Sequence, residues 1–184
     1  MTKAGLLAAA LAAAAVLSGC ISRGIKEGIG AVRGGKGVYA PVQPAHATDG
    51  VKLLTGYTRF ELGQIKDNFG GKAPRRLGEL LPAKFEAALA KKGIPNTPGG
   101  KTVVIRGEIL HYEQEGMVGL AFGDFEEVLT RLDMVDKSSG KVLAIANCIG
   151  RSTESVNRGV DSKADGLAKA IADWIAENYP KPKE

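Results

Sequence analysis

The chain has 184 residues, of which 44% are hydrophobic and 24% are charged. This balance is ordinary for a globular protein and excludes collagen-like and strongly biased disordered classes. The formal net charge of +5 is modest, so charge alone does not indicate a nucleic-acid-binding protein.

The first twenty residues have the pattern of a signal peptide that ends at a cysteine. A short basic start containing Lys3 precedes an apolar run from Leu6 to Val16. That run is far shorter than the ~20 residues that a membrane-spanning helix needs, and it matches the apolar region of a signal peptide. Residues 1–19 are therefore predicted to be removed. An ordinary secretory signal cut elsewhere and an uncleaved anchor are the alternatives.

The residues at the end of this segment resemble a bacterial lipobox. They read Leu17-Ser18-Gly19-Cys20. The resemblance implies that Cys20 becomes the first residue of the mature protein and carries thioether- and amide-linked acyl chains such as palmitate. Two or more chains hold a protein stably in a bilayer. The lipid bilayer is therefore the first expected partner, reached through acylated Cys20.

The residues after the lipobox bear on the destination of the protein. Ile21 and Ser22 stand where enterobacterial lipoproteins that remain in the inner membrane have an aspartate. The resemblance therefore implies an outer-membrane location, facing the periplasm. An exported and anchored protein does not routinely meet nucleic acid, so we expect no nucleic-acid partner.

Residues 20–50 are predicted to form a tether after the lipidated cysteine. The segment is rich in glycine and then in proline, which favours a flexible chain. Its four cations outnumber its two acidic residues, Glu27 and Asp49. They would suit anionic headgroups, although a merely soluble linker explains them as well. Its glycines and prolines include Gly24, Gly28, Gly30, Gly34, Gly35, Gly37, Pro41 and Pro44.

One domain is predicted over residues 51–180, with a short tail at 181–184. Alternation around Phe60 and Leu62 indicates a strand. A helix follows, with its apolar face at three- and four-residue steps; residues 83–92 are its firmer part, because Pro82 fits only in a first turn or at a kink. Gly93 is expected at the C′ position. The helix stripe comprises Leu77, Leu81, Phe85, Ala88 and Leu89.

Three further strands and a second helix complete the domain. Strands are predicted at 102–114, 126–136 and 141–151, with a hairpin turn over 136–141 in which Gly140 is placed for a positive φ. In the first of these, Gly107 indicates a bulge or close packing of a helix. In the last, both rows are apolar, which indicates a central strand or an interface. The second helix is expected to start at Ser162, with Asp165 completing a capping pair.

Some single residues have both an ordinary and a functional interpretation. Cys148 lacks an intramolecular partner once Cys20 is lipidated, so we interpret it as a buried small hydrophobe; an intermolecular disulfide is the alternative. Trp174 is expected in the core rather than at a ligand. Asn147 lies among larger apolar residues and, if buried, must be hydrogen-bonded.

A glycine-rich apolar loop at residues 116–124 is the candidate contact for a partner. It lacks the glycine spacing of a phosphate-binding loop. Its apolar residues either fold back on the core or form an exposed lip. Its possible partner-contact residues are Leu120, Phe122 and Phe125.

An enzyme is the rival interpretation from another class. The region of His111, Glu113 and Asp124 could act as acid and base or hold a metal. Yet it has no HExxH or CxxC spacing, and a solvated charged loop base explains it better. We therefore expect no catalytic residue, no metal site and no cofactor.

The predicted fold is α+β, in the order β-α-β-β-β-α: a four-stranded, mostly antiparallel sheet with both helices on one face. The segments Val104-Ile105-Arg106-Gly107-Glu108-Ile109, Val135-Asp136 and Ser139-Gly140-Lys141-Val142-Leu143 resemble those of uncharacterised bacterial lipoprotein domains. That family has no assigned activity. The leading function is a non-enzymatic binding or assembly module of the envelope, with another envelope protein as partner. A carrier of lipid or cell-wall fragments is the alternative. The sequence indicates no oligomeric state.

Overall fold

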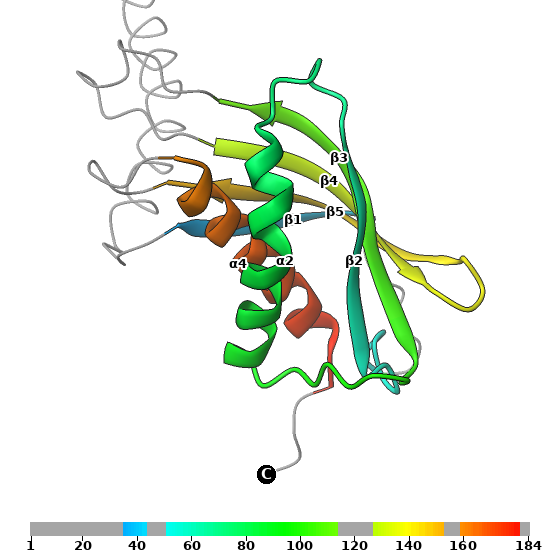
Figure 1. The fold of residues 1–184 in the computed structure, drawn as a ribbon. Coiled ribbons are helices and arrows are strands. Elements are labelled where there is room, and N and C mark those ends of the chain that lie inside the picture. Colours follow the sequence, from blue (N-terminus) through cyan, green and yellow to red (C-terminus); the bar gives the residue numbers. More distant parts are fainter. Residues whose placement is uncertain (1–34, 44–50, 114–126, 153–158, 181–184) are drawn as a thin grey trace, which may run out of the picture. The chain divides into compact units, whose positions relative to one another are not determined.

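The computed structural model describes residues 35–43, 51–113, 127–152 and 159–180. The chain divides into two units, Met1–Val32 and Arg33–Glu184, and all described residues belong to the second. That unit is a mixed α+β fold with a five-stranded sheet and two helices (Figure 1).

The strands lie in the sheet in the order β1-β5-β4-β3-β2. β3 (Thr102–Tyr112), β4 (Glu127–Asp136) and β5 (Val142–Arg151) form an antiparallel meander. β2 (Arg59–Asp67) pairs with β3 in parallel, as a strand-helix-strand crossover requires. β1 (Lys36–Gln43) pairs antiparallel with β5. β1 and β2 are thus the two edges of the sheet.

The prediction of four strands is wrong, because β1 is a fifth strand and the order is β-β-α-β-β-β-α. β1 lies inside the range 20–50 that we interpreted as a tether. Gly35 and Gly37 led to that interpretation, yet they serve close packing. A Cβ at Gly37 would lie 2.2 Å from the carbonyl oxygen of Gly166 in the second helix, so the strand backbone itself touches the helix.

The first helix, α2, runs from Arg75 to Lys91 and contains Pro82. Helix α2 therefore extends beyond residues 83–92, the firmer part of the prediction. Pro82 is exposed, so the carbonyl of Gly78 that it leaves without a donor can bond to water. The predicted buried stripe and Gly93, whose φ is 66°, are both confirmed. No described helix is long and apolar enough to span a membrane.

The second helix, α4, runs from Val160 to Asn178. It begins two residues earlier than expected, and the predicted capping pair is wrong: Gly159 is the N-cap, and no side chain caps the first turn. Asp165 instead pairs with Lys169, at 2.7 Å. Trp174 is 1% exposed, which confirms its place in the core.

α4 packs closely against β1 and β5 because glycines remove the side chains between them. A Cβ at Gly150 of β5 would lie 2.3 Å from the Lys163 carbonyl oxygen, and one at Gly166 of α4 would lie 2.5 Å from the Lys36 carbonyl oxygen. α2 packs against α4, on the same side of the sheet (Figure 1). Both helices and one face of the sheet share a single core.

Irregular pairing changes which side chains enter that core. The register of β3 on β4 shifts between Ile109 and His111, so Tyr112 is buried rather than facing away as strict alternation predicts. Gly107 approaches the neighbouring strand and not a helix: a Cβ there would lie 2.0 Å from the Arg131 carbonyl oxygen.

Candidate functional site

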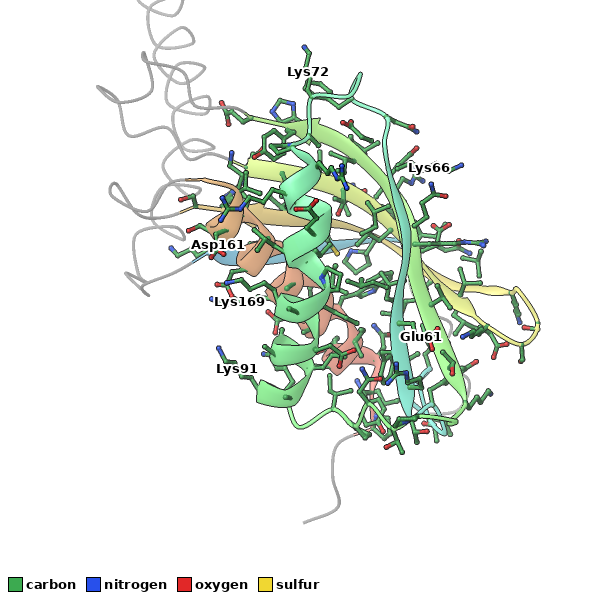
Figure 2. The ribbon with its side chains drawn as sticks, in the orientation of Figure 1. Glu61, Lys66, Lys72, Lys91, Asp161 and Lys169 are labelled. Carbon is green, nitrogen blue, oxygen red and sulfur yellow. The ribbon has the colours of Figure 1, made fainter. Side chains whose placement is uncertain are left out.

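The face of the sheet opposite the helices is the candidate site. Along β5 buried residues alternate with half-buried ones, because only one face lies beneath α4. In Figure 2, Lys66 extends from β2 away from both helices, whereas Lys91 lies on α2. We call the helix-free side the open face.

A polar groove of about 490 Å³ crosses the open face over β2, β3 and β4. The register of β2 on β3 shifts between Leu62 and Ile65, where Gly63 allows close approach: a Cβ there would lie 2.8 Å from Val104 Cγ1. The groove is lined by Gln64, Lys66, Arg106, Gly107, Glu108, Arg131 and Asp133.

Charges of opposite sign face each other across this groove. Arg106 is opposite Asp133, and Glu108 is opposite Arg131. Among the described residues, neither pair forms an ion pair, and Glu108 instead accepts a hydrogen bond from Asn68. Arg106 and Arg131 are both exposed, and a guanidinium group can bind a carboxylate or phosphate group in a bidentate manner.

One end of the open face is closed by a fixed charge cluster. Lys137 Nζ lies 2.7 Å from Glu61 Oε2, and Arg59 Nε lies 3.5 Å from Glu61 Oε1. The hydrogen bond from Lys137 is the main reason that the pKa of Glu61 is lowered. The Glu61 carboxylate is thus engaged by two cations, and the cluster keeps a formal charge of one positive unit.

A second carboxylate, Asp136, holds the hairpin turn. It accepts hydrogen bonds from the Tyr57 hydroxyl at 2.7 Å and from the Ser138 and Ser139 amides at 2.9 and 2.8 Å. Bonds from Ser138 and Tyr57 keep the pKa of Asp136 well below its usual range. Burial, together with the hydrogen bond to Asp136, raises the pKa of Tyr57. These hydrogen bonds stabilise the turn. Gly140 in this turn has a φ of 71°, which confirms the predicted positive φ.

The other end of the open face, over β1 and β5, is apolar. Val38 is 50% exposed and lies opposite the half-buried Ile149, and Ile145 and Leu143 are half-buried further along β5. Asn147 lies in this row, and its Oδ1 is buried without a hydrogen-bond partner. Our expectation that Asn147 would be hydrogen-bonded is therefore not met at this atom.

A small apolar cavity of about 230 Å³ lies between α2 and the sheet. Its walls include Ile65, Leu81, Ile109 and Leu167. Pockets for small ligands usually measure about 300–1,000 Å³, so this one is smaller than a lipid or cell-wall fragment requires. It gives the carrier alternative little support.

The structure tests only some of the residues singled out from the sequence. Cys20 and the apolar loop residues Leu120, Phe122 and Phe125 lie outside the described residues, as does Asp124. His111 packs its ring against Phe69, with centroids 5.1 Å apart. Within the described ranges, no three His, Cys, Asp or Glu side chains could hold a metal together.

Cys148 is confirmed as a buried residue of β5. Burial raises the pKa of its thiol to about 12, so the reactive thiolate is scarce at neutral pH. Its buried position also makes an intermolecular disulfide at this residue unfavourable in the folded protein.

Sequence reasoning missed Lys163, which is 2% exposed in the first turn of α4. Its ammonium donates to the Glu113 carbonyl oxygen at 2.6 Å and lies 4.3 Å from the centre of the Tyr112 ring. The charge is thus held by an acceptor and an aromatic face. Its position one residue after the predicted cap made it look like an exposed lysine.

The described residues thus form an α+β fold whose helix-free sheet face carries a polar groove. No family model matches the chain. No curated protein matches it in sequence either. Among solved structures, a PelC dodecamer from Paraburkholderia phytofirmans aligns over 80% of this chain and 99% of its own, with 15% identity and a TM-score of 0.48.

A minor lipoprotein from Acinetobacter baumannii aligns over 66% of this chain and 94% of its own, with 19% identity and a TM-score of 0.34. These likenesses concern the arrangement of helices and strands. They carry no information on the chemistry of the open face.

Proposed function

We propose that the protein is a bacterial envelope lipoprotein, anchored by acylated Cys20 in the outer membrane and facing the periplasm, whose folded unit is a non-enzymatic binding module for another envelope protein. The lipobox and the eleven-residue apolar run support the anchor. The open face is proposed as the contact surface, with the loop residues Leu120, Phe122 and Phe125 as a further contact.

The observation that carries the binding role is the polar groove with its uncompensated cross-strand charges. Most charged side chains on the helix side have partners in this fold: Lys84 pairs with Asp161 at 3.0 Å, and Lys92 pairs with Asp173. On the open face, Arg106 and Arg131 have none among the described residues. Opposite charges that face each other across two strands without forming ion pairs can bind a partner that carries charged groups of its own.

Crosslinking in intact cells tests the binding role. A photoreactive amino acid replaces Arg131 in the groove, and a matched probe replaces Lys91, which is exposed on α2. We expect one protein to be captured from position 131 and lost when Arg106→Glu is added, whereas position 91 captures it in neither background. Equal capture from both positions, or an adduct insensitive to Arg106→Glu, contradicts the proposal.

The anchor is tested separately. Mass spectrometry of the isolated protein should find a mature chain that begins at Cys20 and carries acyl chains. Cys20→Ser should move the protein out of the membrane fraction. A mature terminus at any other residue would refute the anchoring, and it would leave the crosslinking result untouched.

A further inference from the structure

The two edges of the sheet differ in how well they are protected against a further strand. At β2, the Phe60 amide donates to Asn96 Oδ1 at 2.8 Å, and the strand carries the irregularity at Gly63 and outward charges. Such features are the usual protection of an edge. β1 pairs regularly with β5 from Gly37 to Ala40, and no other strand of the described residues pairs with this segment.

The segment from Gly37 to Ala40 is therefore the unprotected part of the sheet edge. Alternate residues of an antiparallel edge strand direct their N–H and C=O groups away from the sheet. Val38 is half exposed. Protection begins only at Pro41, which has no N–H to donate, and the register shifts between Pro41 and Gln43.

A groove of about 430 Å³ runs beside this edge, between β1 and the C-terminal half of α4. It exists because Gly37 lets the strand lie directly against α4. A sheet edge flanked by a helix is the geometry in which extended peptides add as a further strand. The groove is lined by Gly37, Val38, Tyr39, Lys92, Asp173, Ala176 and Glu177.

The charges of the groove favour a cation on its helix side. Lys92 pairs with Asp173. Lys52 Nζ donates to the Glu177 carbonyl oxygen at 2.7 Å and lies 3.7 Å from its Oε1, yet the Glu177 side chain remains 69% exposed and can accept a further cation. Burial is the main reason that the pKa of Tyr39 is raised, and the nearby Glu177 and Asp173 carboxylates add to it. On the other side, Val38 adjoins the apolar part of the open face.

We propose that the edge of β1 and this groove bind an extended segment of a partner polypeptide in which apolar residues alternate with lysine or arginine. Side chains of a strand alternate between faces, so the apolar ones lie beside Val38 and the basic ones reach Glu177. The segment is the recognition element of the envelope partner, and this inference rests on the binding role proposed above.

Hydrogen–deuterium exchange of the full lipidated chain in detergent tests this assignment. The probe is the peptide acetyl-Val-Lys-Val-Lys-Val-amide. Its controls are Val-Glu-Val-Glu-Val and Val-Lys-Pro-Lys-Val, which change the charge or remove an amide donor. With the probe at about ten times its Kd, the outward-facing amides among residues 37–40 should exchange about tenfold more slowly, and both controls should have no effect.

A charge swap separates recognition from damage to the fold. Glu177→Lys should abolish the effect of the lysine peptide and create one for the glutamate peptide. The proposal is overturned by equal effects of all peptides, or by no slowing at about 5 mM, above the Kd of a weak millimolar contact. It is also overturned if exchange at 37–40 slows with protein concentration alone, which would identify a second copy as the occupant. If the lysine peptide has no effect while crosslinking from position 131 still captures a partner, the edge site is refuted and the proposed binding role is not.

Discussion

Gly166→Ala is expected to destabilise the protein, although alanine is the better helix former. Within a helix, alanine is favoured over glycine by about 1 kcal/mol. At Gly166, however, the new Cβ would lie 2.5 Å from the Lys36 carbonyl oxygen and 2.9 Å from the Arg151 amide nitrogen. Both are backbone atoms of paired strands, so α4 would have to withdraw by roughly 1 Å to restore ordinary contact.

The magnitude follows from the balance of these two effects. Overpacking costs about 1–3 kcal/mol and occasionally more, and the rigid backbone on both sides puts this site at or above the upper end. After the gain in helix propensity, we expect a net loss of about 2 kcal/mol. For a chain of this size, that loss lowers Tm by roughly 4–8 °C.

The measurement is urea unfolding followed by the fluorescence of Trp174, the sole tryptophan. Gly78→Ala is the matched control: it also lies within a helix, but a Cβ there meets nothing within 4 Å, so it should stabilise the protein by about 0.5–1 kcal/mol. If Gly166→Ala stabilises the protein as much as Gly78→Ala does, the reasoning from close strand–helix contact is refuted.

Three further outcomes follow from the core and the turn. Phe85→Ala removes a ring that is 1% exposed and should cost about 3–5 kcal/mol in urea unfolding; a loss below about 1 kcal/mol would contradict its place in the core. Cys148 should resist a thiol reagent at pH 8 and react once urea unfolds the chain, because burial raises its pKa to about 12; rapid reaction in native buffer would show that the thiol is accessible. Asp136 has a lowered pKa in the folded state, so its stabilisation is complete above the pKa of an unfolded aspartate and is lost as pH falls below that value. The stability difference between wild type and Asp136→Asn, measured by urea unfolding, should therefore be larger at pH 7 than at pH 3, and a constant difference would contradict this role.

The elements with strong periodicity were predictable from the sequence. The stripe from Leu77 to Leu89 gave the buried face of α2 correctly, and alternation located β3, β4 and β5. Local patterns succeed there because burial of one face repeats with the period of the element.

β1 could not be predicted in the same way, because its determinants lie far away in the chain. Gly35 and Gly37 look like flexible residues until the backbone of α4 is placed against them. The prediction of where α4 starts was wrong for a related reason. Ser162 is a good capping residue, but it is buried against the strands and lies inside the helix. The open face could be predicted from the sequence only in part, because Arg106 lies opposite Asp133 only in one register of β3 on β4.

The position of β1 has a mechanical consequence. The chain enters the described fold at Gly35 and passes at once into an edge strand, so tension arriving from the preceding residues loads the β1–β5 ladder first. The glycine contacts with α4 hold that strand on a second side. A pull along the chain must therefore slide or peel β1 against a helix as well as a sheet before it reaches the remaining strands.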